Sequence, residues 1–565
     1  MKKITLSLIL LIGFTSFNAF AQTKIRFRNE VFTDAQIQAA KGLPFATNLN
    51  WLIIDQVDLK DTAKAKQTQV FQDITYLKTQ IAMGNKFGMK LKYYLPKSSP
   101  GGDSTILKIT TLKMDAYMPS MTADTSKKRP IIIYLHTGNF LPPGINGSPC
   151  GDKSDSIVVD MCKGWARRGF VAIAIDYRLG WNPISTSLAV RRGTLLNAVY
   201  RSIHDVQECV RVIKGMGAAY NMDINKIAIV GEGTGAYIAH AYNTLDKYPE
   251  FMALPKFAGA IDTATVGWLD GSRGKLNLYT KSSVSTKVQV IGTLGGALAD
   301  TTWLEAGDAP TISMQCVLDP FAPFGYGTVI VPPPLNLDVV DVDGANNTIM
   351  RAQRLGNNAL FAAIPSKDPY TTKARSLYNR TVSYILPAPA DKITIRSGEG
   401  MYPFLLPKAA QFSNQASPYQ WWDPTSKEGK YIIQAPDITA HMNGLSSNSD
   451  MSKAKSKLYQ DTIHGFMTRR IAYAMGLLTV TDLGVTKTKV SGVKIYPNPA
   501  TNSFSVSYPG MINSITVTDI SGKIVYQAEV NSTSYTVSSL NLNQGLYLIN
   551  ISTNQGNAIE KLIIK

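Results

Sequence analysis

The sequence is poor in the residues from which proteins build zinc sites. Its 565 residues include four cysteines and five histidines, without a Cys-x-x-Cys pair and without His-x-His or His-Glu-x-x-His spacing. Catalytic zinc sites draw on several such ligands, some of which usually stand close together in sequence. We therefore expect neither a metal centre nor a cofactor.

Acidic residues are also scarce. Asp and Glu number 40 against 58 Lys and Arg, so the formal net charge is +18. The basic residues form only short runs, such as 127–129 and 453–457, whereas a nucleic-acid-binding protein concentrates them in a stripe. We expect no nucleic-acid partner. The basic surface is either evenly solvated or attracted to an anionic surface polysaccharide.

Long apolar runs are absent after the first 21 residues, so we expect no membrane-spanning segment in the mature chain. Residues 1–21 contain Lys2 and Lys3, an apolar stretch over 4–14 and a small-residue site at 19–21. This pattern is typical of a cleaved secretory signal peptide. The protein is therefore expected to be exported through the periplasm.

Four cysteines follow this segment, at positions 150, 162, 209 and 316. An even number in an oxidising compartment permits disulfides, and the most local pair joins Cys150 to Cys162. The alternative is that all four are buried as small apolar side chains.

Between residues 105 and 480, apolar runs alternate with helical segments. Val- and Ile-rich runs separated by helices indicate a mostly parallel, doubly wound sheet, so the fold class is α/β. The predicted strands are 106–118, 130–136, 170–177, 226–231, 256–262, 311–319 and 431–437. Residues 22–104 are expected to pack on this domain as an extension. Residues 364–430, rich in Pro and aromatics, form an insertion that is either a lid or a small satellite core.

The pattern changes after Leu483. Short alternating strands, separated by Asn, Gly and Pro, predict a small all-β immunoglobulin-like sandwich over 490–565. A linker over 481–489 joins it to the main domain.

This tail resembles the C-terminal sorting domain of type IX secretion substrates from the Bacteroidota. The matching pieces are YPNPA at 496–500, DISGK at 519–523, GLYL at 545–548 and KLIIK at 561–565. The resemblance implies that an outer-membrane translocon binds residues 490–565 and that the protein is secreted or reaches the outer cell surface. The competing interpretation is an ordinary adhesive or carbohydrate-binding sandwich.

Three stretches of the main domain resemble carboxylesterases and lipases of the α/β-hydrolase fold, in the order of that family. Residues 129–140 are similar to its strand and His-Gly-Gly-Gly-Phe loop, although Thr137 and Asn139 replace glycines. Residues 175–179 are similar to its Tyr-Arg-Leu strand end, and 226–236 to its Gly-x-Ser-x-Gly elbow. The resemblance implies an α/β-hydrolase domain over roughly 105–480.

The elbow has a glycine where the family has its catalytic serine. Gly231 and Gly235 hold the flanking positions, which leaves Gly233 at the nucleophile position. Glycine accepts the strained turn, so the architecture can survive without the chemistry. The alternative nucleophile is Thr234, but that register puts Glu232 where a small residue is needed, and a β-branched residue at the strained position.

The resemblance also implies the remaining catalytic groups. Asp319 follows a predicted strand as the family's acid does, and its alternative role is that of a turn residue. His441 is the candidate base because it follows the predicted strand 431–437 and precedes a helix, whereas His464 lies within a helical repeat. Gly138 and the backbone N–H of Thr234 are the candidate oxyanion-hole groups.

Three functions are compatible with these observations. The first is a degenerate, non-hydrolytic hydrolase that binds a ligand or partner. The second is an active esterase that uses Thr234 with His441 and Asp319. The third is a structural component of a surface secretion or adhesion complex. Loss of the nucleophile costs about as much activity as loss of a whole triad, which favours the first.

Overall fold

The computed structural model describes residues 25–51, 109–252, 254–257, 260–261, 263–274, 277–331, 335–366, 368–383, 392–406, 415–434, 437–483, 492–519, 523–538, 542–553 and 556–565. The chain divides into two compact units, one over Ile25–Gly484 and the other containing Val485–Lys565. The signal peptide predicted over 1–21 and most of the linker predicted over 481–489 lie outside the described residues.

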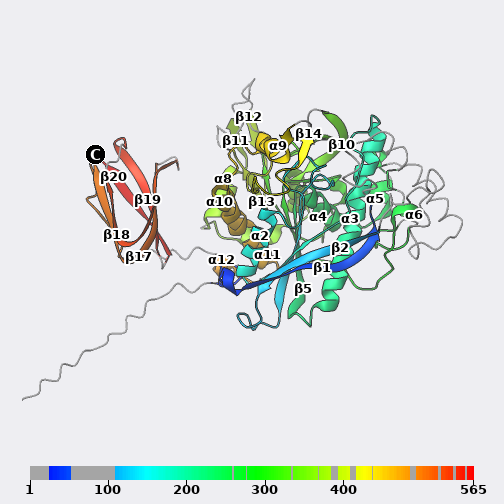
Figure 1. The fold of residues 1–565 in the computed structure, drawn as a ribbon, viewed down its shortest axis with the longest axis horizontal. Helices are drawn as coiled ribbons and strands as arrows, with labels where there is room; N and C mark the ends of the chain where they lie inside the picture. The colour runs from blue at the N-terminus through cyan, green and yellow to red at the C-terminus, as the bar shows by residue number, and fades with distance from the viewer. Residues whose placement is uncertain are drawn as a thin grey trace, which may run out of the picture. The chain divides into compact units, whose positions relative to one another are not determined.

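An eight-stranded sheet forms the centre of the first unit (Figure 1). Its order is β1 (Ile37–Leu49), β2 (Ile109–Pro119), β4 (Val171–Ile175), β3 (Arg129–Leu135), β5 (Met222–Glu232), β6 (Val290–Leu294), β8 (Thr311–Cys316) and β13 (Met401–Phe404). The strands from β4 to β13 run parallel, while β2 and β1 continue the sheet antiparallel. Strands β3, β4, β6 and β8 are buried along their whole length, as their apolar sequences predict.

Helices cover both faces of this sheet. One face holds α2 (Ser156–Arg167), α10 (Lys453–Ile463) and α11 (Arg469–Ala474), with the π-helical turn η7 (His464–Thr468) between the last two. The other face holds α3 (Leu188–Met216) and α4 (Thr234–Thr244). Successive strand residues point to opposite faces, so Ile132 packs in the first core and Ile133 in the second.

Shorter elements complete the first unit. They are η1 (Asp34–Gln36), α5 (Tyr248–Met252), η3 (Pro255–Phe257), α6 (Thr263–Val266), β7 (Ala297–Leu298), η4 (Thr301–Trp303), β9 (Tyr326–Val331), β10 (Leu337–Gly344), α7 (Ala345–Arg354), η5 (Ala359–Ala363), α8 (Pro369–Leu377), β11 (Arg380–Ser383), β12 (Lys392–Ile395), β14 (Ile432–Gln434), β15 (Ile438–Thr439), α9 (Ala440–Ser447) and α12 (Val480–Leu483). Within the ranges given above, no helix combines the length and the apolar character needed to cross a membrane.

The predicted α/β fold is confirmed, but the predicted strand 256–262 is wrong, and β6 was not predicted. The described part of 256–262 contains the end of the turn η3, and Phe257 packs against Trp303 in a side cluster. The sheet continues instead through β6, whose five residues include Gly292 and Thr293. These two residues weaken the apolar pattern from which a strand is recognised.

Residues 37–49, predicted to belong to an extension packed on the main domain, form an edge strand of the sheet itself. Within the predicted extension 22–104, the structure describes residues 25–51, and β1 pairs antiparallel with β2 at the edge. The burial of β1 is mostly low until Phe45, so its sequence lacks the apolar run of a central strand. This edge position explains why the pattern was not recognised.

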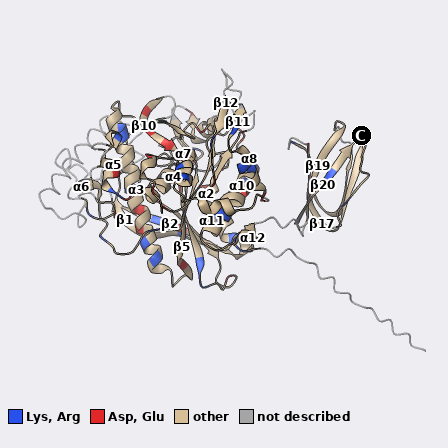
Figure 2. Ribbon diagram, turned by 180° about the vertical axis from the view of Figure 1, so that it is seen from behind, with Lys and Arg blue, Asp and Glu red and all other residues tan. Residues whose placement is uncertain are grey.

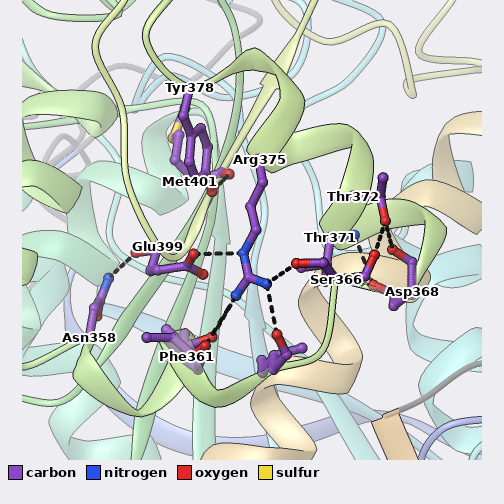
Figure 3. Close-up of polar contacts among 12 residues, drawn as sticks. Asn358, Phe361, Ser366, Asp368, Thr371, Thr372, Arg375, Tyr378, Glu399 and Met401 are labelled. Carbon is purple, nitrogen blue, oxygen red and sulfur yellow. Dashed lines mark hydrogen bonds and ion pairs between the residues drawn. The ribbon is translucent and has the colours of Figure 1, made fainter.

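The predicted insertion 364–430 also contributes to the sheet. It contains α8 and β13, the last parallel strand, whereas the predicted strand 431–437 forms only the small β14–β15 hairpin. Arg375 on α8 joins separate parts of this segment. Its guanidinium pairs with Glu399 at 2.8 Å and donates to Ser366 Oγ at 2.7 Å (Figure 3). Tyr419 and Trp422 of this segment are buried, and Tyr419 packs in the main core beside the sheet rather than in a separate satellite core.

The predicted disulfide does not form. Cys150 and Cys162 are both free and buried, and they occupy different surroundings. Cys162, on α2, packs in the core with Tyr117, whereas the carboxylates of Asp155 and Glu232 act electrostatically on the Cys150 thiol. Burial raises the pKa of both thiols, so they remain protonated apolar groups, which is the alternative that the sequence left open.

The second unit is an antiparallel β domain, as predicted. Its strands are β16 (Lys494–Tyr496), β17 (Ser503–Asp519), β18 (Ile524–Ser538), β19 (Gly545–Thr553) and β20 (Gly556–Ile564). The long strand β17 pairs with β16, β18 and β19, and β20 pairs with β19. Alternate residues, including Phe504 and Ile549, are fully buried in its core.

Basic residues are not confined to one element. Lys and Arg stand on several helices of the first unit, for example Arg192 on α3, Lys373 on α8 and Lys457 on α10 (Figure 2).

Candidate functional site

A sharp turn between β5 and α4 carries the glycine that the sequence places at the nucleophile position. Gly233 has φ 53° and ψ −113°, a conformation that side-chain-bearing residues adopt only under strain. Its N–H donates to Leu294 O at 2.9 Å, and its carbonyl accepts from Ala236 N at 3.0 Å. The turn is therefore fixed by β6 on one side and by the start of α4 on the other.

The flanking glycines allow the strand and the helix to approach. A Cβ added to Gly231 would lie 2.6 Å from Ala236 N, and one added to Gly235 would lie 2.8 Å from His136 O. Real Cβ atoms do not approach backbone this closely. The spacing of these two glycines is thus a packing requirement of the turn, independent of what stands between them.

Thr137 fills the space into which a side chain at position 233 would project. A Cβ built on Gly233 would collide with Thr137 Oγ1 and lie 3.0 Å from Thr137 Cβ. Thr137 follows β3 after His136 and is half-buried. From the sequence, Thr137 was noted only as a replacement for a glycine of the family's loop. Its contact with Gly233 could not be predicted, because the two residues lie about a hundred positions apart and meet only through tertiary packing.

Thr234 is the first residue of α4, and its hydroxyl is already engaged. Thr234 Oγ1 lies 3.1 Å from the Tyr177 hydroxyl, which donates its own hydrogen to His136 O at 2.8 Å. Since the tyrosine's hydrogen is used, Thr234 is the donor of the first bond. Burial raises the pKa of Tyr177, so this acceptor is a neutral phenol and not a base.

Asp319 lies in the loop after β8, where the resemblance implies the catalytic acid. Asp319 Oδ1 accepts from Phe321 N at 2.8 Å and Ala322 N at 3.1 Å, and Gln315 Nε2 lies 3.4 Å from Oδ2. Burial raises the pKa of Asp319 from 3.8 to about 6. All five histidines are described, and none of them is hydrogen-bonded to this carboxylate. Its contacts are those of a half-buried turn residue.

His441 is the second residue of α9, directly after the β14–β15 hairpin and before α10. Its Nδ1 accepts a hydrogen bond from Trp422 Nε1 at 3.0 Å. The indole nitrogen can only donate, so a neutral His441 carries its proton on Nε2. A triad histidine uses the opposite arrangement, with Nδ1–H donating to the acid and a bare Nε2 facing the nucleophile. His464, as predicted, lies within a helical run, in η7.

Glu232 forms a buried polar contact beneath the turn that the sequence did not predict. Its carboxylate accepts from the Tyr134 hydroxyl at 2.7 Å and from Gln420 Nε2 at 2.5 Å. Burial raises the pKa of Glu232, and the two hydrogen bonds partly oppose this shift. Because Gln420 belongs to the predicted insertion, this contact ties that segment to the turn.

The predicted oxyanion loop is ordered around Gly138. Gly138 has φ 130°, and a Cβ there would lie 2.8 Å from Gly151 Cα, so the two loop segments touch through their backbones. Asn139 takes φ 57°, and its carbonyl accepts from Trp181 Nε1 at 2.7 Å. The Ala236 N–H donates to Gly233 O, whereas the N–H groups of Thr234 and Gly235 have no acceptor earlier in α4. Donors for an anionic group therefore remain at this turn.

Acidic, cysteine and histidine side chains do not gather into a metal centre. Within the described ranges, no group of three or more of them has the geometry to hold an ion.

Comparison with known proteins gives one family match in each of the two units of the chain. Residues 114–293 match the BD-FAE family, and residues 494–565 match the family described as a secretion system C-terminal sorting domain. None of the curated proteins matches the chain significantly. The BD-FAE match includes β5, the Gly233 turn and α4.

Solved structures similar to the chain include those of esterase 2 from Thermogutta terrifontis. The enzyme phosphonylated by cyclosarin is 19% identical, with a TM-score of 0.26 over 38% of this chain and 69% of that chain. Its propionate-bound form is 18% identical, with a TM-score of 0.25 over 38% and 70% of the two chains. The apo form is 17% identical, with the same TM-score of 0.25 and the same coverage of 38% and 70%.

Proposed function

We propose that this chain, a secreted esterase-like α/β-hydrolase with a C-terminal type IX secretion sorting domain, has lost hydrolytic activity. Its hydrolase domain then acts in binding a ligand or partner at the cell surface. This proposal concerns the catalytic state of the first unit alone.

The contact between Gly233 and Thr137 is the observation that carries the proposal. Position 233 lacks a side chain, and the space where one would project is occupied by Thr137. If only the side chain at position 233 were missing, one substitution could restore it. Because Thr137 occupies the space of that side chain, the surroundings of position 233 have adapted to glycine.

The other candidate groups support the same interpretation. The Thr234 hydroxyl donates to a neutral phenol, so no base withdraws its proton, and nucleophilic hydroxyls require such a base. His441 has its Nδ1 occupied by Trp422, and Asp319 is bonded to its own loop. In hydrolases that use a triad, losing the nucleophile lowers kcat by roughly a million-fold.

The turn retains its backbone geometry and its backbone N–H donors, which are suited to binding a hydrogen-bond acceptor. The glycines at 231 and 235 preserve the close strand-to-helix approach, and the N-terminus of α4 places the N–H groups of Thr234 and Gly235 at the turn, where a helix favours anions. We expect the site to favour an anionic or strongly hydrogen-bond-accepting group.

Hydrolysis of p-nitrophenyl acetate and butyrate by the purified mature chain tests the proposal. We expect wild-type turnover at the level of buffer with an inert protein. Thr234→Ala and the control Thr244→Ala, at the other end of α4, should leave that level unchanged. We also expect Gly233→Ser to gain nothing.

Turnover clearly above background that Thr234→Ala abolishes and Thr244→Ala preserves would contradict the proposal. It would establish instead an esterase that uses Thr234.

A further inference from the structure

The last two strands of the C-terminal unit carry an exposed apolar face. In the antiparallel register of β19 and β20, Leu546 stands opposite Ile563, and Leu548 lies two pairs further along, on the same side. These side chains point outward together with Ile559, at exposed fractions of 43% for Leu546, 39% for Leu548, 65% for Ile559 and 43% for Ile563. We call these four residues the β19–β20 face.

The same side of the neighbouring strands is mostly polar. On β17, Thr518 pairs with Leu548, and Thr516 pairs with Asn550. On β18, the exposed Gln527 stands opposite Thr516, whereas Ile524, opposite Thr518 at the start of the strand, is apolar and 50% exposed. Residues opposite one another project from the same side of a sheet. The exposed apolar residues of this side are therefore concentrated on β19 and β20, and Ile524 borders them.

The sequence motifs at the chain end supply both the core and this face. In GLYL and KLIIK, Tyr547, Leu562 and Ile564 are buried in the core of the unit. Their neighbours Leu546, Leu548 and Ile563 point outward. The inward residues account for folding, but exposed apolar side chains on paired strands weaken solubility unless a partner covers them.

The free edge of β20 is closed over its C-terminal residues 561–565, so a partner cannot simply add a strand along that part. Asn498 Nδ2 donates to Lys561 O at 2.6 Å, and Ile563 N donates to Asn498 Oδ1 at 2.9 Å. Ala500 N then donates to Ile563 O at 2.8 Å, and Lys565 N to Ala500 O at 2.8 Å. Strand addition requires an unpaired edge. Docking at this end of the unit must therefore use the face.

We propose that the β19–β20 face is the surface through which the type IX secretion machinery holds this protein. The occupant is a component of that machinery with an apolar surface bordered by acidic groups, because Lys561, opposite Leu548, and Lys565 are exposed beside the face. The unit's identity as a secretion sorting domain singles out the machinery from other occupants. The proposal does not depend on whether the first unit hydrolyses esters.

Secretion of full-length variants tests this surface. The chain is expressed in a bacterium with a type IX system as Leu548→Glu, Ile563→Glu and the double variant. The controls are Thr516→Glu and Gln527→Glu, which place the same charge on the polar half of the same side. Secreted and periplasmic amounts are measured, and resistance of the C-terminal unit to protease is measured on the periplasmic protein.

We expect each face variant to lower the secreted fraction by about tenfold or more, with periplasmic accumulation of protease-resistant protein, since a charge buried without a partner weakens an interface strongly. The controls should be secreted normally. Normal secretion of the double variant would overturn the proposal, as would an equal loss in the controls. The proposal would also be overturned if the face variants lost secretion only when they lost protease resistance. If the face variants were secreted normally but changed their oligomeric state, the face would be assigned to self-association and the proposal would be overturned as well.

Discussion

Substitutions at positions 137 and 233 are expected to be coupled in their effect on stability. A serine at 233 places its Cβ 3.0 Å from Thr137 Cβ and in collision with Thr137 Oγ1. Overpacking of this kind costs about 1–3 kcal/mol, and the positive φ of 53° adds about 1–3 kcal/mol for a residue other than glycine. Gly233→Ser alone should therefore lose about 2–6 kcal/mol in the free energy of unfolding.

Thr137→Gly removes the colliding atoms but not the backbone strain. The double variant should recover the overpacking part, so the coupling energy is about 1–3 kcal/mol in the favourable direction. Urea denaturation of the four proteins, followed by tryptophan fluorescence, measures it. All seven tryptophans lie between residues 51 and 422, so this signal reports the first unit alone.

Additive effects would refute the reasoning. Independent sites combine to within about 0.3–0.5 kcal/mol. If the double variant equals the sum of the two single variants within that margin, Thr137 does not occupy the space above Gly233.

Three further predictions concern the site. Gly231→Ala should lower the free energy of unfolding by about 2–4 kcal/mol, because its Cβ would lie 2.6 Å from Ala236 N. The control Gly215→Ala, within α3 and with no atom within 4 Å of the added Cβ, should raise the free energy of unfolding by about 0.5–1 kcal/mol. Equal urea midpoints for the two variants would contradict this difference. Since burial raises the pKa of Asp319 from 3.8 to about 6, ionising it opposes folding. The wild type should therefore lose about 2 kcal/mol relative to Asp319→Asn as pH rises from 4 to 7, whereas a constant difference in urea titrations would disprove the raised pKa. Histidine 15N shifts should give the Nε2–H tautomer for His441 and an altered tautomer balance in Trp422→Phe; an Nδ1–H tautomer in the wild type would be inconsistent with the Trp422 bond.

The fold was predictable where apolar patterns were strong. Strands such as β3 and β4 are continuous apolar runs buried on both faces, so their sequences identify them directly. β1 and β13 were not identified, because one is a partly exposed edge strand and the other has only four residues. Edge and very short strands lack the pattern from which central strands are recognised.

The features of the site that depend on local sequence were predictable, but the contacts between segments distant in sequence were not. The glycine spacing of the turn is a local feature, and the sequence located Gly233 within it. The contacts that decide its chemistry join distant segments: Thr137 with Gly233, Tyr177 with Thr234, and Trp422 with His441. Such contacts depend on tertiary packing, which no spacing along one sequence reveals.

Covalent capture of a nucleophile tests the loss of catalysis most directly. The purified mature chain is incubated with excess fluorophosphonate, a reagent that esterifies activated hydroxyl groups, and its intact mass is measured. Because the Thr234 hydroxyl faces a neutral phenol and position 233 has no side chain, we predict an unmodified mass. A stoichiometric adduct that maps to the 231–235 turn, and that disappears in Thr234→Ala, would contradict the account.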